Sequence, residues 1–238
     1  MTLLAVTGTG TEVGKTVTTA AVAALAVAAG ARVAVAKLAQ TGLLPGEDGD
    51  LAEVRRLAGA VETRELARYP DPLAPDTAAR RAQRTGLRFD TAVEAVRALD
   101  AEHDLVLVEG SGGLLARFDD TGWTLADLVV KLDAPTVMVA AAGLGTLNAA
   151  ALTAQALRHR GAELRGAVIG SWPARPDLAM RCNLVDLPDM ARTPLLGVIP
   201  HASAVLDRAA FAAVARAGLD ASLGGEFDAE TFVKGWPA

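Results

Sequence analysis

Short apolar runs recur along the chain, with little alternation between polar and apolar positions. They are rich in β-branched residues, and stretches of helical periodicity separate one run from the next. Near-continuous apolar character is typical of strands that are covered on both faces, as in a parallel sheet. Buried strands are therefore expected at Leu3 to Val6, Arg32 to Ala36, Asp104 to Val108, Thr136 to Ala141, Ala167 to Ile169 and Leu195 to Ile199.

Helical patterns fill most of the segments between these runs. The expected helices are Lys15 to Ala29, Asp50 to Ala58, Thr77 to Gln83, Asp90 to Ala101, Thr124 to Lys131, Thr146 to Arg160, Asp177 to Leu184 and Ala204 to Ala217. Strands that alternate with helices predict an α/β fold with a doubly wound, mostly parallel sheet flanked by helices. Ligands of such sheets bind beyond the carboxyl ends of the strands, so the residues that follow each run are the candidate functional residues.

The first run is followed by a candidate phosphate-binding loop. It reads Thr7-Gly8-Thr9-Gly10-Thr11-Glu12-Val13-Gly14-Lys15-Thr16 and leads into a helix. In such a loop, backbone N–H groups turn towards the phosphates, the lysine reaches the terminal ones and the last hydroxyl holds Mg²⁺. Five residues separate Gly8 from Gly14, one more than in the strict pattern. A flexible glycine turn is the alternative, but the flanking elements favour a P-loop NTPase type of domain, expected to span residues 1–238.

Composition excludes several classes of protein. The chain has 238 residues, 51% of them hydrophobic, and a net charge of −5 with scattered basic residues, which gives no footprint for nucleic acid or an anionic membrane. Cys182 is the only cysteine and the three histidines are far apart, so a disulfide framework or Cys/His metal site is not expected and the cytoplasm is the expected location. Residues 134–157 are uncharged, but proline and glycine divide them into strand, turn and helix rather than a membrane span.

Charged residues follow two further strands. Lys37 follows the second run, and Asp50 follows an acidic, glycine-rich loop. Lys37 is either a site residue or a surface lysine, and Asp50 is either a site residue or a helix cap. Glu109 stands at the tip of the third run beside a glycine turn, where a carboxylate is well placed to hold Mg²⁺ and needs a cationic partner. The amides around Gly145 can receive an anion such as a substrate carboxylate.

Together, these motifs resemble the dethiobiotin synthetase family. The resemblance rests on the phosphate-binding loop, on Lys37 with Thr41-Gly42, on Asp50, on Glu109 to Leu115 and on Leu144 to Asn148, in the family's order over most of the chain. It implies an ATP-dependent ring closure in biotin biosynthesis. In that reaction 7,8-diaminononanoate takes up CO₂, the γ-phosphate of ATP activates the carbamate, and the second amine closes a cyclic urea. The resemblance also implies a homodimer that shares its substrate site across the interface.

The resemblance further implies a role for each matching residue. The implied catalytic residues are Lys37, Lys15 and Thr16, the implied Mg²⁺ ligands are Thr16, Asp50 and Glu109, and the implied substrate-binding residues are Lys37, Thr41, Gly145, Thr146 and Asn148. The implied nucleotide-binding residues are Glu12, Val13, Gly14, Lys15, Thr16, Val17, Asp50, Glu109, Gly110, Ser111, Gly112, Gly170, Ser171, Ile199, Pro200 and His201. The segment from Pro70 to Pro75 is expected near the substrate, without individual roles.

The chain departs from the family pattern at several positions. Gly10 stands where Asp is frequent, Leu38 where Pro is usual, and Ala149 where His is frequent. Gly170 stands where many members have an Asn that reads adenine. The hypothesis that follows is loose base selectivity, with CTP or other nucleoside triphosphates used comparably to ATP or better.

Three alternatives use the same sheet. A switch ATPase of the partitioning or cell-division kind carries a second lysine early in the loop, where this chain has Gly10, and no membrane-seeking tail is evident. An amide-forming ligase of the wider superfamily normally has a nucleophilic cysteine with a histidine, and Cys182 lacks that setting. A non-enzymatic nucleotide-binding module requires Lys37 and Glu109 to be incidental.

Overall fold

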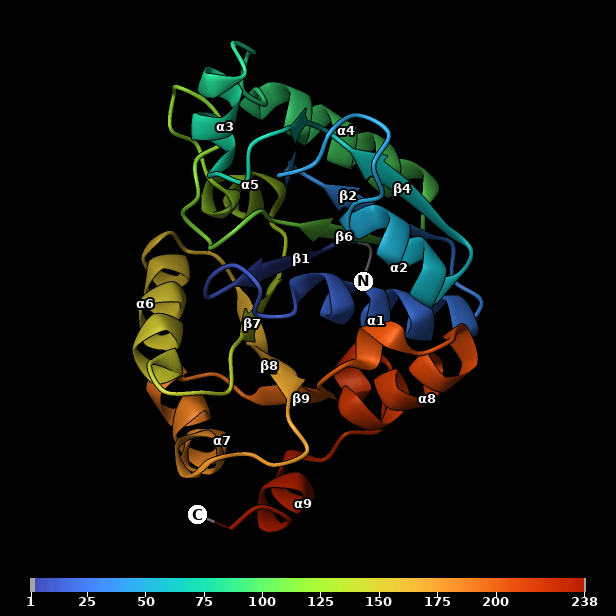
Figure 1. Ribbon diagram of the computed structural model, residues 1–238, viewed down its shortest axis with the longest axis vertical. Helices are drawn as coiled ribbons and strands as arrows, with labels where there is room; N and C mark the ends of the chain where they lie inside the picture. The colour runs from blue at the N-terminus through green and yellow to red at the C-terminus, as the bar shows by residue number, and fades with distance from the viewer. Residues whose placement is uncertain (1–2, 238) are drawn as a thin grey trace.

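The computed structural model describes residues 3–237 and has a parallel sheet at its centre (Figure 1). The strand order is β4-β2-β6-β1-β7-β8-β9, and each neighbouring pair is parallel. The strands are β1 (Leu3–Gly8), β2 (Val33–Lys37), β4 (Val61–Glu65), β6 (Leu105–Glu109), β7 (Thr136–Ala140), β8 (Leu164–Trp172) and β9 (Leu195–Pro200). A second, two-stranded sheet pairs β3 (Gln40–Thr41) with β5 (Arg68–Tyr69).

Helices cover both faces of the large sheet. One face packs against α1 (Lys15–Ala28), α2 (Asp50–Ala58) and α8 (Arg208–Gly218). The other packs against α4 (Phe89–Glu102), α5 (Leu125–Leu132), α6 (Thr146–His159) and α7 (Leu178–Ala191). Neighbouring residues of one strand therefore enter different cores: Leu4 lies in the first, whereas Leu3 and Ala5 lie in the second. The expected doubly wound α/β fold is confirmed, because both faces of each central strand are buried.

Shorter helices lie at the two ends of the molecule. Helix α3 (Pro75–Arg81) is at the top of Figure 1 and α9 (Ala229–Lys234) is at the bottom, near the C-terminus. Two 3₁₀ turns, η1 (Ser203–Val205) and η2 (Ala221–Leu223), flank α8. No helix within residues 3–237 is long and apolar enough to cross a membrane.

Several elements differ from the sequence-based expectation. Strand β4 was not predicted, because its sequence, Val-Glu-Thr-Arg-Glu, alternates half-buried and exposed positions at the sheet edge, where charged residues are tolerated. Strands β3 and β5, of two residues each, and α9 were also missed. Helix α7 continues past the expected end at Leu184 to Ala191. Helix α8 begins at Arg208 rather than at Ala204, because η1 intervenes and the Asp207 side chain caps the helix.

The sheet register brings three strand ends together. Lys37, the last residue of β2, pairs with Glu109, the last residue of β6, and Glu109 also pairs with Val6 of β1. The loop that follows β1 therefore begins beside both charged residues. Parallel strands place all three carboxyl ends at one edge, where ligands of such sheets bind.

Candidate active site

The phosphate-binding loop folds tightly against the start of α1. Glu12 (φ 56°) and Gly14 (φ 96°) both have left-handed backbone conformations, and such local reversals aim backbone N–H groups inwards, as anion binding requires. A Cβ on Gly14 would lie 2.4 Å from the Gly170 carbonyl oxygen, so both the dihedral angle and the space call for glycine. The Lys15 ammonium donates to the Gly10 carbonyl at 2.7 Å. Burial, and then the nearby charge of Lys37, lower the Lys15 pKa.

Lys37 lies between two carboxylates. Its ammonium nitrogen is 2.5 Å from Asp50 Oδ2 and 2.7 Å from Glu109 Oε1. The side chains of Lys37 and Glu109 are almost fully buried, whereas that of Asp50 is 34% exposed. Burial on its own would lower the Lys37 pKa, but the two carboxylates outweigh it and raise that pKa above its ordinary value. Lys37 therefore keeps its positive charge at neutral pH inside a largely buried cluster.

The residues predicted as Mg²⁺ ligands lie in the same cluster. The Thr16 hydroxyl donates to Glu109 Oε1 at 3.0 Å, the oxygen that also faces Lys37. Glu109 Oε2 is buried and has no hydrogen-bond partner within residues 3–237, which is rare for a buried carboxylate oxygen. A buried acceptor of this kind is suited to binding a cation. The oxygens of Thr16, Asp50 and Glu109 fit Mg²⁺, which is usually held by one or two carboxylates and by substrate phosphates. No closed group of three or more His, Cys, Asp or Glu side chains occurs in the described part of the chain.

A cavity of about 920 Å³ opens from this cluster. The predicted site residues that line it are Glu12, Gly14, Lys15, Thr16, Val17, Lys37, Thr41, Asp50, Glu109, Ser111 and Gly112. Pro72 to Pro75 line its far side, so the segment expected near the substrate reaches the same space. Gln40 lines it too, although the sequence pattern gave Gln40 no role. The volume is within the range of ordinary ligand sites.

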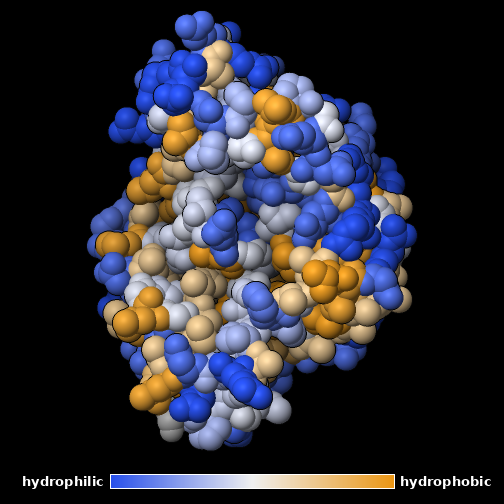
Figure 2. Space-filling view, viewed as in Figure 1, coloured by the Kyte–Doolittle hydropathy of each residue, from blue (hydrophilic) through white to orange (hydrophobic). Residues whose placement is uncertain are grey.

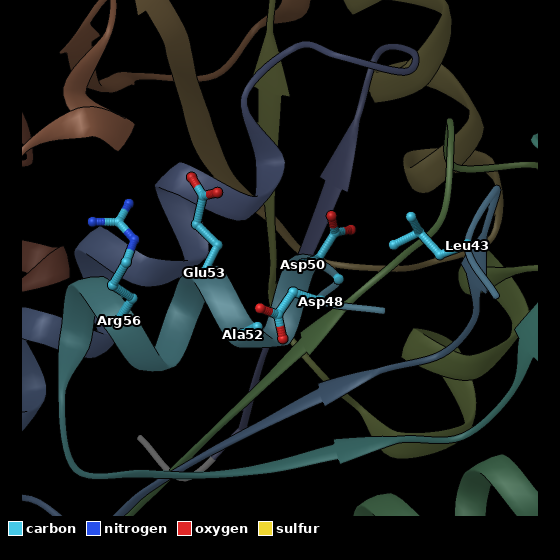
Figure 3. A pocket seen from close by; sticks show the side chains of 7 residues that line it. Leu43, Asp48, Asp50, Ala52, Glu53 and Arg56 are labelled. Atoms are coloured by element: carbon cyan, nitrogen blue, oxygen red, sulfur yellow. The ribbon is translucent and has the colours of Figure 1, made fainter. Parts of the chain in front are cut away.

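A smaller hollow of about 330 Å³ adjoins the cavity at the start of α2. Asp50 lines both spaces. In Figure 3 the carboxylate of Asp50 points upwards from the start of α2, whereas that of Asp48 points downwards, away from it. Of the two acidic residues at this turn, only Asp50 reaches Lys37.

The residues predicted to read the base lie apart from this cavity. Ser171 Oγ is 2.9 Å from His201 Nδ1, and the His201 N–H donates to the Trp172 carbonyl at 2.7 Å. Gly170 packs against the phosphate-binding loop, and a Cβ there would lie 2.1 Å from the Val13 carbonyl oxygen. Ile199 is 1% exposed and packs in the core beneath α1 and α8.

The predicted substrate-carboxylate residues are not brought to Lys37 within one chain. Gly145, Thr146 and Asn148 do not line the 920 Å³ cavity. Gly145 (φ 94°) is the N-cap residue of α6, and Thr146 Oγ1 is buried without a hydrogen-bond partner in the described part of the chain. Leu144, just before them, is 93% exposed. The Thr146 N–H donates to the Gly143 carbonyl at 3.2 Å, and the outer side of the turn is exposed.

Comparisons with known proteins agree with this geometry. A family model described as an AAA domain matches residues 2–208. The ATP-dependent dethiobiotin synthetase BioD of Saccharopolyspora erythraea is 64% identical, over 95% of this chain and 99% of that protein. The protein of the same name from Streptomyces coelicolor is 60% identical, over 98% of each.

Solved structures share the fold at much lower identity. The cell division ATPase MinD of Pyrococcus furiosus has a TM-score of 0.57 at 19% identity, over 98% of this chain and 95% of that one. A likeness at this identity shows the fold alone, so it does not support the switch-ATPase alternative. The relatives that match at 60% identity or more along almost the whole chain are synthetases. The chain belongs to the dethiobiotin synthetase family of ATP-dependent ligases.

Proposed function

We propose that this chain uses MgATP to close the cyclic urea of dethiobiotin from 7,8-diaminononanoate and CO₂, in biotin biosynthesis. The observation that carries the proposal is the buried Lys37 ammonium, which is held by Asp50 and Glu109 beside the phosphate-binding loop. A nucleotide-binding module has no need for a buried cation in this place. Relatives named for this reaction, at 60% and 64% identity, support the assignment.

The chemistry has to bring two anions into contact. One amine of the diamine adds to CO₂ and loses a proton, which gives a carbamate. A carbamate oxygen then attacks the γ-phosphorus, and ADP leaves. The second amine attacks the carbamoyl carbon of the mixed anhydride and loses a proton, phosphate leaves, and the ring closes. The attack on phosphorus joins two negatively charged groups, so neutralisation and positioning supply most of the catalysis.

Lys37 supplies the positive charge for that encounter. It is charged throughout the neutral range, and it lines the same cavity as Lys15 and Thr41. Lys15 and the loop amides hold the phosphates, whereas Lys37 neutralises the carbamate. The Thr41 hydroxyl hydrogen-bonds the carbamate or the amine end of the substrate. Thr16, Asp50 and Glu109 would hold Mg²⁺, which would supply positive charge to the phosphate oxygens.

We further propose that a second copy of the chain completes the substrate site. Gly145, Thr146 and Asn148, which would hold the substrate carboxylate, do not line the cavity of their own chain. Exposed apolar side chains surround this turn and continue over α6 and α7: Leu144, Leu152, Leu178 and Val185. In Figure 2, orange atoms occur on the side of the molecule where α6 and α7 lie, and also on the opposite side near α8. Clustered exposed apolar residues are typical of a protein interface. The single cysteine suits the cytoplasm, where we place the enzyme.

The test is phosphate release from MgATP and, in parallel, MgCTP, with bicarbonate and with or without 7,8-diaminononanoate. Mass detection of the cyclic urea follows. We expect release that depends on the diamine and yields dethiobiotin. Release that is indifferent to the diamine would favour a switch ATPase, and the absence of release with every nucleotide would contradict the proposed reaction.

A further inference from the structure

Helix α2 begins without a capping side chain of its own. Its N-cap residue is Gly49, in an extended conformation, and no side-chain cap comes from that position in the described chain. The first N–H groups of any helix need acceptors from outside the helix. Here Gln40 Oε1, from strand β3, accepts a hydrogen bond from the Asp50 backbone N–H at 3.0 Å. The cap of α2 is therefore supplied by a different element.

The Gln40 side chain is itself firmly held. It is 7% exposed, its Nε2 donates to the Thr41 carbonyl at 3.3 Å, and its backbone N–H donates to the Ala67 carbonyl at 2.8 Å. A Cβ on Gly49 would lie 2.7 Å from Gln40 Oε1. Glycine at position 49 is thus what allows Gln40 to reach the helix.

Asp50 is consequently held at two points. Gln40 holds its backbone N–H, and Lys37 holds its carboxylate at 2.5 Å. The loop that leads into Asp50 is tied down separately, because Arg68 donates to the carbonyls of Leu44 and Glu47. Asp50 is a predicted ligand of Mg²⁺, so its position decides whether its oxygens meet the metal.

We propose that Gln40 is a positioning residue, which caps α2 and so holds the Asp50 carboxylate beside Lys37 and the Mg²⁺-binding oxygens. Its action passes through Asp50 rather than through contact with the reacting atoms. The proposal uses the Mg²⁺ role of Asp50 from the proposed function, but it is stated in terms of helix order and metal binding. Both can be measured without the diamine.

The experiment compares Gln40→Ala with the double variant Gln40→Ala/Gly49→Ser. Loss of the cap should speed hydrogen exchange of the α2 peptide at residues 49–53 on the order of fivefold, while peptides of α1 exchange as before. Mn²⁺ binding in the presence of ADP, followed by the paramagnetic resonance of free Mn²⁺, should weaken by about the same factor. Binding of ADP in EDTA should be unchanged.

The double variant is the rescue. Removal of the Gln40 side chain removes the closest contacts of a Cβ at position 49 and leaves the mobile end of the Arg68 side chain at 3.1 Å. The serine hydroxyl can then accept from the first turn of α2. Both exchange and Mn²⁺ binding should return to within about twofold of the parent. Gly49→Ser alone should not improve on the parent, because its Cβ meets Gln40.

Three results would overturn the proposal: unchanged exchange in Gln40→Ala, faster exchange with unchanged Mn²⁺ binding, or no rescue. If the alanine variant does not fold, Gln40→Met, which keeps the buried volume but lacks the acceptor, takes its place. Failure of the parent enzyme to make a cyclic urea would contradict the proposed function and leave these readouts intact.

Discussion

The carboxyl ends of β2 and β6 and the turn after β7 are organised in opposite ways. At the first, Lys37, Asp50 and Glu109 are held together by short ion pairs and are mostly buried. At the second, Leu144 is 93% exposed, and Thr146 Oγ1 has no partner among the described residues. The difference supports the proposal that the chain binds the phosphates by itself and leaves the far end of the substrate to a second copy.

Physical chemistry explains why the two regions differ. A buried charge without a partner is unstable, so Lys37 and Glu109 have to be paired when the chain folds. The exposed residues of the turn, such as Leu144, carry no such penalty before assembly. The folding of one chain therefore sets the positions of Lys37 and Glu109, whereas the proposed carboxylate site would be completed when two chains associate.

The largest effect on turnover should come from removing the positive charge of Lys37, which lies between Asp50 and Glu109. Lys37→Ala is expected to leave MgATP bound and to reduce turnover on the order of a thousandfold, because the carbamate loses its neutralising cation. It should also melt at a lower temperature, since Glu109 loses its buried partner. Rapid-quench kinetics and nucleotide titration measure the two effects separately.

Lys15→Ala is the control variant for comparison with Lys37→Ala. It should bind the nucleotide more weakly, whereas Lys37→Ala should still bind it. Near-normal turnover in Lys37→Ala would show that the ordered cluster is structural. The assigned carbamate role would then be wrong.

A smaller effect on catalysis is expected from a change in the exposed turn after β7. Leu144→Asp should shift the chain towards the monomer and raise the KM for the diamine by about tenfold or more, because the partner no longer presents its carboxylate site. The concentration of nucleotide at half-saturation should change little. Light scattering and steady-state kinetics test this prediction, with Val130→Asp on α5 as an exposed control. A Leu144→Asp protein that remains dimeric with an unchanged KM would contradict the proposed role of this turn in the dimer.

Base selectivity should show a more modest effect. Gly170 offers no side chain to adenine, so kcat/KM values for ATP, CTP and GTP should agree within about tenfold, a difference of about 1.4 kcal/mol. Side-by-side kinetics with the three magnesium nucleotides measure it. A strong preference for ATP would mean that other groups, such as Ser171 or His201, read the base.

The smallest effect concerns a pair remote from both regions. Arg32 and Asp104 join the amino-terminal ends of β2 and β6 on the surface, and hydrogen bonds from Arg32 lower the Asp104 pKa to about 2. Because the pKa of Asp104 in the fold lies below its ordinary value of 3.8, the ion pair stabilises the fold at pH values above 3.8. This stabilisation is lost as the pH falls towards 2. Asp104→Asn should therefore lower the melting temperature slightly at pH 7 and not at pH 2, with catalysis unchanged. An equal loss at both values would contradict the ion-pair origin.

The sequence predicted the central strands because they are apolar throughout. It predicted Lys37 and Glu109 as site residues because each directly follows such an apolar run. The contact between them could not be predicted, since it depends on the register that sets Lys37 opposite Glu109. Strand β4 was missed because charges alternate along it. Gln40 was missed because a glutamine beside a threonine matches no motif, and its role depends on a helix start ten residues away.

The packing of Gly170 was equally invisible in the sequence. The absent side chain could be seen there, but the contact with the phosphate-binding loop could not. In the structure, a Cβ at this position would press on the Val13 carbonyl, so Gly170→Asn would also have to move that loop. A substitution at Gly170 would therefore change the geometry of the loop as well as any contact with the base.

The most direct test of the account is complementation between two inactive proteins, Lys37→Ala and Asn148→Asp. If each active site takes Lys37 from one chain and Asn148 from the other, a mixed dimer contains one intact site. Subunits mixed in equal amounts and allowed to exchange should then recover about a quarter of the parent activity. If the mixture stays inactive although mixed dimers form, each chain uses its own residues, and the proposed division of labour between the two regions is wrong.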